Sequence, residues 1–231
     1  PYTTLFRSVL GAGDDLLARA GSRVDAFGTL GTIRLLVDAH DGASPDFSND
    51  LGAVMLLAGR LQARTVSAVG GGDADRVLIT GTEADVLTLV QGGGGDDTVL
   101  AGSNASFVDG TRATSNTGGR LDALRGRIVV DGGAGGDRVV LDDSGNVIAG
   151  SVLLEDGEVS GLGLPAGFGY SSLDANTDAL TLQLGSGGST VTVAAVTEGT
   201  TTTVIGGAGA DHFVVPGLGQ RLNTIGDLLS V

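Results

Sequence analysis

The stretch GGAGGDRVV, residues 132–140, places two glycines, a third glycine two positions later, an aspartate and an apolar run one after another. Similar stretches are GGGGDDTVL, residues 92–100, and GGAGADHFV, residues 206–214. We call this pattern the glycine–aspartate box and write it G-G-x-G-x-D-x-U-x, where U is apolar. A single structural role should account for both the glycines and the acid.

Three further boxes are imperfect copies. GGGDADRVL has Asp73 where the third glycine belongs, and its boxed acid is Asp75. LGAGDDLLA lacks the first glycine and carries Asp15, whereas LGSGGSTVT has Ser189 in place of the acid. The complete boxes carry Asp97, Asp137 and Asp211.

The spacing of the boxes predicts a longer repeat. Asp75 and Asp97 are 22 residues apart, as are Ser189 and Asp211, and the second pair lies 114 residues after the first. Equal offsets indicate a duplication. We therefore expect a first unit over residues 9–119 and a second over 120–220. RLNTIGDLLSV, at residues 221–231, is similar to RLDALRGRIVV at 120–130 and is expected to start a third, truncated unit.

The first eight residues, PYTTLFRS, match the translation of the end of a widely used sequencing adapter. We expect residues 1–8 to be non-native and the natural sequence to begin near Val9.

Runs rich in β-branched residues follow the boxes, as in RVLIT and RVVLD, and no amphipathic helix follows them. Phosphate-binding loops need a helix after the glycines, so we do not expect the boxes to bind phosphate groups or dinucleotides. Turns are expected at DDSGN and EDGE. Residues 51–64 fit either a helix or two strands around Gly59. The chain is thus predicted to be all-β, a parallel β-solenoid with about one 22-residue coil per box.

Composition and charge limit the function. The chain has 42 glycines, 3% aromatic residues and a net charge of −14, with no cysteine. A surface this acidic argues against binding nucleic acid or inserting into an anionic membrane. Carboxylates are instead natural ligands of Ca²⁺, which prefers oxygen.

Glycines allow the backbone to turn so that carbonyl groups converge, and the boxed acid adds a charged ligand. We expect Asp73, Asp75, Asp96 and Asp97 to share a calcium site across neighbouring coils. Asp137, Asp211 and Asp15 are further expected calcium ligands, and the counterpart pair of Ser189 and Asp211 is expected to bind more weakly because it lacks one acid. Glycine turns without metal remain the alternative.

The boxes resemble those of hemolysin-type calcium-binding proteins, the repeats-in-toxin group, although here they are spread at intervals of 22 to 60 residues instead of every nine. The longer unit, including LDALRGRIVVDGGAGGDRVVLDDSGN, resembles a repeat of very large bacterial surface or secreted proteins. That resemblance implies a structural or adhesive role outside the cell or at its surface, with neighbouring repeats and a cell-surface or polysaccharide ligand as partners. It implies no enzymatic activity.

Two other interpretations stay open. One is a carbohydrate-active parallel β-helix, which would place paired acids in a groove. The other is a β stalk without metal. Near the amino terminus, His40 lies in an acidic loop that would either bind a cation or be a solvated insertion.

Overall fold

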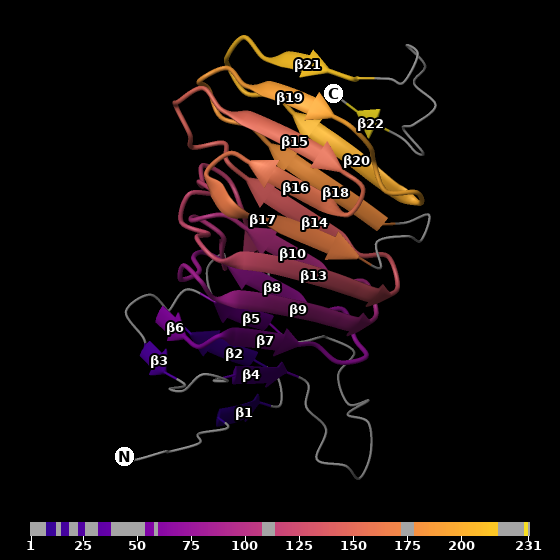
Figure 1. The fold of residues 1–231 in the computed structure, drawn as a ribbon. Helices are drawn as coiled ribbons and strands as arrows, with labels where there is room; N and C mark the ends of the chain where they lie inside the picture. The colour runs from indigo at the N-terminus through magenta and orange to yellow at the C-terminus, as the bar shows by residue number, and fades with distance from the viewer. Residues whose placement is uncertain are drawn as a thin grey trace.

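The computed structural model describes residues 8–12, 15–18, 23–25, 32–37, 54–57, 60–107, 114–171, 178–216 and 229–230. Within these ranges the protein is all-β and contains no helix. Most strands belong to two large sheets that lie face to face, with successive strands stacked from the amino-terminal to the carboxyl-terminal end (Figure 1). The all-β prediction is confirmed, and the sheets are built largely from parallel pairs.

The first sheet has ten strands. In spatial order they are β1 (Ser8–Ala12), β4 (Thr32–Val37), β7 (Thr65–Val69), β9 (Leu87–Gly94), β13 (Arg127–Ala134), β17 (Leu164–Ser171), β16 (Glu158–Gly161), β15 (Ser151–Glu155), β19 (Thr190–Val193) and β21 (His212–Val214).

The second sheet has eight strands, all paired in parallel. In spatial order they are β2 (Asp15–Ala18), β5 (Val54–Leu57), β8 (Arg76–Ile79), β10 (Thr98–Ala101), β14 (Arg138–Asp142), β18 (Asp178–Gln183), β20 (Thr200–Ile205) and β22 (Leu229–Ser230). Two small pairs complete the described strands: β3 (Arg23–Asp25) with β6 (Arg60–Gln62), and β11 (Ser106–Phe107) with β12 (Thr114–Ser115).

From β7 onward the chain alternates between the two large sheets. It passes from β7 to β8, returns to β9 and crosses again to β10, so that each return adds a strand beside the previous one. The repeat spacing of 22 residues appears directly in the register, because Arg76 is level with Thr98 and Thr190 with His212. One such interval therefore advances the chain by one strand in each sheet.

An antiparallel insert interrupts this alternation once. Strands β15, β16 and β17 all lie in the ten-stranded sheet, with β16 antiparallel to both neighbours. The β15–β16 turn is formed by the predicted EDGE sequence, in which Glu155 is level with Glu158. Strand β17 continues the parallel pairing from β13, and β15 passes it on to β19.

The main core lies between the two sheets. It is built from inward-facing aliphatic residues of both, such as Ile128 and Val130 from β13 and Val139 and Leu141 from β14. Phe168 of β17 is the largest fully buried side chain. Alternate residues of the inner strands face this core, as the half-buried strand pattern predicts. A smaller buried cluster on the eight-stranded sheet comprises Leu78, Leu100, Ala105 and Val140.

The local predictions agree with the structure where it describes them. The runs after the boxes form β8, β10, β14 and β21, and the choice within residues 51–64 falls on two strands, β5 and β6. The His40 loop, residues 1–7 and most of residues 217–231 lie outside the described residues. Among the described residues, no helix has the length and apolar character needed to cross a membrane.

Candidate functional site: the aspartate column

The first glycine of a box leaves room for the aspartate of the same box, as at Gly70, Gly92 and Gly206. A methyl group on Gly92 would collide with Oδ2 of Asp97 and with the carbonyl oxygen of Gly132 in the next box. The second position requires glycine for a different reason. Gly133 has a φ of 98°, which is unfavourable for other residues. A side chain there would also strike the Gly93 carbonyl. The glycines thus allow successive boxes to stack closely.

Four aspartates stack at the entrance to the eight-stranded sheet. They occupy equivalent positions at the starts of β8, β10, β14 and β18, as the strand registers show. We call this set the aspartate column; its members are Asp75, Asp97, Asp137 and Asp178.

The first three amides of the column each donate a hydrogen bond to the carboxylate of the next member. The N–H of Asp75 donates to Oδ1 of Asp97 at 2.7 Å, and the N–H of Asp97 donates to Oδ1 of Asp137 at 2.9 Å. The N–H of Asp137 donates to Oδ1 of Asp178 at 2.7 Å. The side chains therefore extend the backbone pairing of the strands, which also includes an N–H from Thr98 to the Asp75 carbonyl. The column connects four neighbouring strands.

These carboxyl groups are buried. The four residues are between 1% and 4% exposed, which is unusual for aspartate. Oδ2 of Asp75 accepts the N–H of Gly71 at 2.7 Å, but Oδ2 of Asp97 and Oδ2 of Asp137 are buried without a hydrogen-bond partner in the described structure. Two inner carboxyl groups thus each keep one oxygen that nothing described satisfies.

Burial favours the neutral form of the two inner members of the column, Asp97 and Asp137, by raising the pKa of each. The pKa of Asp97 is raised to about 8, mainly by loss of water and in addition by the neighbouring carboxylates Asp75 and Asp137, against the lowering effect of the hydrogen bond from the Asp75 amide. Desolvation also raises the pKa of Asp137. An ionised column therefore needs a compensating positive charge, whereas a protonated column does not.

Some of the predicted calcium ligands belong to this column, and others lie next to it. Asp75, Asp97 and Asp137 belong to the column. Asp96 is exposed, and its Oδ1 accepts the N–H of Gly136 on the outside of the turn. Asp73 is partly buried, in the connection that leads to Asp75. The structure therefore places the four acids expected to share a site on two levels, inner and outer.

Asp211 and Ser189 repeat the arrangement on the other side of the sheets. The N–H of Ser189 donates to Oδ1 of Asp211 at 2.8 Å. Their boxes join the eight-stranded sheet to the ten-stranded sheet, whereas the boxes of Asp75, Asp97 and Asp137 connect in the opposite direction. Since parallel strands share their ends, the two sets of boxes lie at opposite edges. The duplicated 22-residue pairs are alike in sequence but not in location.

Asp15 does not occupy the boxed position. The register places it level with Val54, which is level with Arg76, one residue past Asp75. The fourth column member, Asp178, was missed because no glycine box precedes it. Its sequence Asp-Ala-Leu has the acid and the buried apolar residue two positions later, as in Asp-Arg-Val at Asp75, and that shorter pattern would have identified it.

Two further buried acids have structural partners. Asp142 accepts the N–H of Gly119 at 2.7 Å, and Asp143 accepts the N–H of Leu121 at 3.1 Å and an Asn146 side-chain amide at 3.0 Å. They fix the long connection before β13 to the turn after β14. Burial raises the pKa of Asp143.

The column suits a hard cation in the type of its atoms, since carboxylate and carbonyl oxygens are the ligands that Ca²⁺ prefers. The unpartnered Oδ2 atoms of Asp97 and Asp137 are available for such a role. Within the described ranges, no three acidic or histidine side chains converge as a ready-made metal cluster. Backbone carbonyls would therefore have to supply much of the coordination.

The fold and the column together define an all-β protein with largely parallel sheets, in which glycine–aspartate boxes form several of the connections between strands. No protein-family model, curated protein or solved structure matches the chain.

Proposed function

We propose that the chain is a structural or adhesive repeat module, a parallel β-solenoid from a large bacterial protein that is secreted or displayed at the cell surface. The repeat units at 9–119 and 120–220 would then be consecutive segments of one rod, with neighbouring repeats as their partners. A cell-surface or polysaccharide ligand would be the target of adhesion, and no catalysis is required.

The single observation that carries the proposal is the continuity of the aspartate column. From β8 to β18, successive strands of the eight-stranded sheet are aligned in register and joined by backbone pairing, by core packing and by an aspartate at the same place in each of these four strands. Such stacking gives an array in which each unit stabilises the next. A stalk needs this property, because each added coil extends the same sheets and the same core.

Calcium is the proposed structural ligand of the boxes, as the resemblance to hemolysin-type repeats implies. Oδ2 of Asp97 and Asp137, together with glycine carbonyls of the boxes, would hold the ion. A bound divalent cation would supply the positive charge that the buried carboxylates need. At tenfold its dissociation constant, an ion that binds only the folded state adds about 1.4 kcal/mol per site.

Thermal unfolding at pH 8.5, followed by circular dichroism, tests calcium directly. We expect calcium to raise the melting temperature relative to excess chelator, and Asp97→Asn to remove much of that gain because it removes a charged ligand. Asp156→Asn is the matched control, since Asp156 is an exposed acid in the β15–β16 turn. Equal melting with calcium and with chelator would leave a metal-free β stalk.

A further inference from the structure

A groove crosses the outer face of the ten-stranded sheet. Its cavity volume is about 670 Å³, within the range of ligand pockets. Thr65, Leu87 and Arg127 lie level on the adjacent strands β7, β9 and β13 and line part of it. Pro165 and Ala166 of β17 line another part. With strands about 4.8 Å apart, the groove extends over about 14 Å across these four strands.

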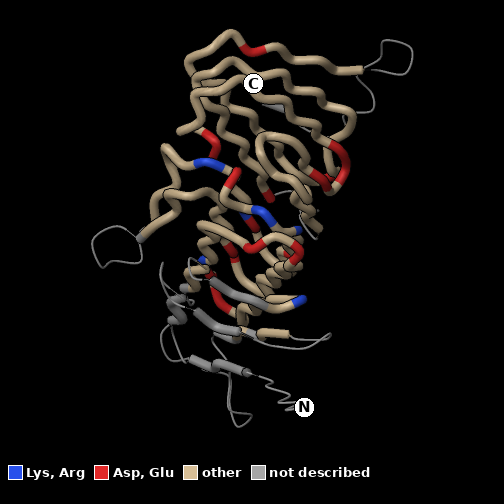
Figure 2. The backbone as a smooth tube through the Cα atoms, turned by 60° about the vertical axis from the view of Figure 1, so that its left-hand side comes forward, with Lys and Arg blue, Asp and Glu red and all other residues tan. Residues whose placement is uncertain are grey.

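Arginine is concentrated in this groove. Arg64, Arg125 and Arg127, three of the 13 arginines of the chain, line it beside a single acid, Asp85. No arginine or lysine occurs between residues 139 and 220, and basic segments are sparse among the acidic ones in Figure 2. Since Glu83 and Glu158 pair with two of these arginines, the groove is about neutral, and in a protein of net charge −14 an anion is repelled less here than by the acidic surface elsewhere.

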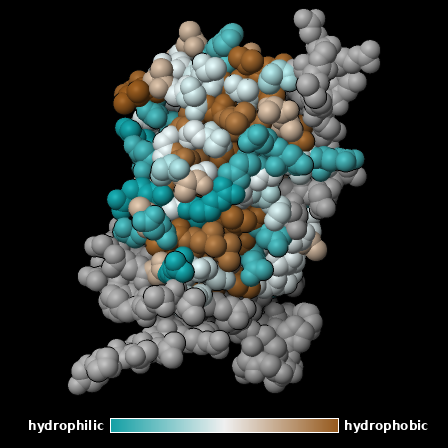
Figure 3. Space-filling model, viewed as in Figure 1, coloured by the Kyte–Doolittle hydropathy of each residue, from teal (hydrophilic) through white to brown (hydrophobic). Residues whose placement is uncertain are grey.

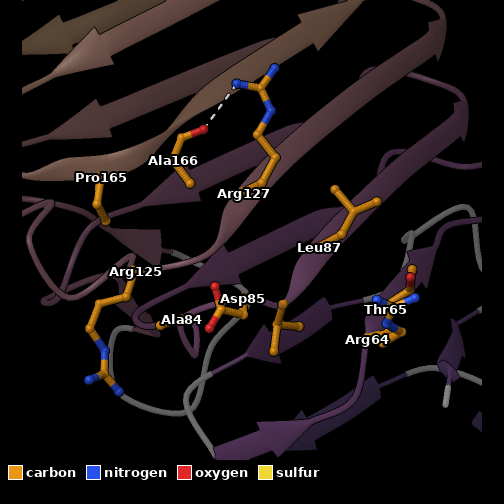
Figure 4. Close-up of a pocket in the computed structure, with 10 residues that line it drawn as sticks. Arg64, Thr65, Ala84, Asp85, Leu87, Arg125, Arg127, Pro165 and Ala166 are labelled. Atoms are coloured by element: carbon orange, nitrogen blue, oxygen red, sulfur yellow. Dashed lines mark hydrogen bonds between the residues drawn. The ribbon is translucent and has the colours of Figure 1, made fainter. Parts of the chain in front are cut away.

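The three guanidinium groups are held differently. Arg127 forms a two-bond ion pair with Glu158 and also donates to the Ala166 carbonyl at 3.2 Å, so its position is fixed. Arg125 donates to Glu83 at 3.0 Å and keeps a half-exposed side chain. Arg64 is exposed and has no ion-pair partner among the described residues. In Figure 4, Arg64 and Arg125 lie on opposite sides of Leu87, while Arg127 reaches towards Ala166.

Apolar side chains lie beside these charges. Leu87, Leu89 and Val129 are only partly buried on the outer face of β9 and β13, and Leu89 is level with Val129. Figure 3 shows hydrophobic side chains exposed between hydrophilic ones on this face. A ligand that fits must therefore combine apolar C–H surface with acidic groups.

We propose that the groove binds a short segment of an acidic polysaccharide, with its carboxylates on Arg64 and Arg125 and a sugar ring against Leu87. Arginine forms paired hydrogen bonds with carboxylates, and the C–H face of a sugar packs on aliphatic side chains. The proposal names a ligand for the adhesive role, but it rests on the groove and not on calcium. Arg127 acts as a positioning residue that shapes the groove through Glu158 and Ala166.

Titration of the whole chain with a trigalacturonate, followed by NMR or calorimetry in excess chelator, tests the proposal. Chelator excludes calcium bridging between acidic protein and acidic sugar. We expect binding of the trigalacturonate and none of the neutral maltotriose. Arg64→Gln and Arg125→Gln should each weaken binding about fivefold or more, because each removes charge-assisted hydrogen bonds. Glu83→Gln should strengthen it by releasing Arg125.

Arg138→Gln is the matched control, since Arg138 is exposed outside the groove and its loss changes the net charge equally. The affinity of this variant for the trigalacturonate should stay within about twofold of that of the parent chain. Unchanged melting temperatures would show that all variants fold. Absence of trigalacturonate binding, an affinity of the Arg64 and Arg125 variants equal to that of the parent chain, or an affinity of the parent chain for citrate equal to that for the trigalacturonate would each overturn the proposal. None of these outcomes depends on whether calcium stabilises the fold.

Discussion

The backbone N–H of Asp97 donates a hydrogen bond to Oδ1 of Asp137, 40 residues later in the sequence, at 2.9 Å. The two residues stand at the same position of adjacent strands, β10 and β14. The boxed acid is therefore a side-chain acceptor for the neighbouring coil, whatever else it binds. This acceptor role explains why an aspartate recurs at this position, since a glycine turn alone would not require an acid there.

Removal of that acceptor should be costly. Asp137→Ala leaves the buried Asp97 amide without its partner, which should lower the free energy of unfolding by about 1–3 kcal/mol. Asp137→Asn keeps an oxygen acceptor and should cost less than the alanine variant in excess chelator. Urea denaturation measures both values, with Asp122→Ala, an exposed acid, as the control. Equal losses for alanine and asparagine would show that the acceptor is not what matters.

Stability without calcium should depend on pH in a defined direction. Folding raises the pKa of Asp97 from 3.8 to about 8 and that of Asp137 as well, so the folded state favours the protonated carboxyl. The stabilising effect of these protons is complete below about pH 4 and is lost as the pH rises through about 8. In chelator, we expect the free energy of unfolding to be at least about 2 kcal/mol lower at pH 9 than at pH 5.

The contribution of Asp97 to this trend is isolated by Asp97→Asn, which cannot ionise. The variant should flatten the pH dependence and be more stable than the parent at pH 9 in chelator. Urea denaturation across pH 5 to 9 gives the comparison. If the free energy of unfolding of the variant changed with pH as steeply as that of the parent, other titrating groups, which both chains share, would be responsible for the pH dependence.

The glycines of the box should differ sharply in their tolerance of substitution. Gly133→Ala introduces a side chain at a φ of 98° and against the Gly93 carbonyl, so we expect a loss of about 2 kcal/mol or more. Gly72 occupies the third, variable box position and has open space around it. Gly72→Ala should therefore be neutral or slightly stabilising. Similar melting temperatures for the two variants would contradict the stacked arrangement of the boxes.

Much of this structure follows from short-range sequence patterns. β-branched runs after turn residues predicted β8, β10 and β14, and the 22-residue spacing predicted which strands would be level. The location of the second pair of boxes could not be predicted, because a box has the same sequence pattern whether it leads into the eight-stranded sheet, as before β8 and β10, or out of it, as after β18 and β20. Asp178 shows the same limit for the site. Its partner Asp137 is 41 residues away, and only the assembled sheet makes them neighbours.

The insert should be part of the same cooperative unit as the rest of the described core. Phe168 of β17 is fully buried among residues of both sheets, and β17 pairs with β13 through Ile128. Phe168→Ala should therefore lower the free energy of unfolding by about 3–5 kcal/mol while keeping a single transition. Val147→Ala is the control, because Val147 is 71% exposed and its loss should change stability by no more than about 0.5 kcal/mol. Denaturant unfolding followed by circular dichroism and by tyrosine fluorescence should give coincident curves for Phe168→Ala, since buried Tyr170 lies two residues away in the same strand. An early tyrosine transition, with the remaining β signal unchanged, would instead make the insert a separate module attached to the sheet.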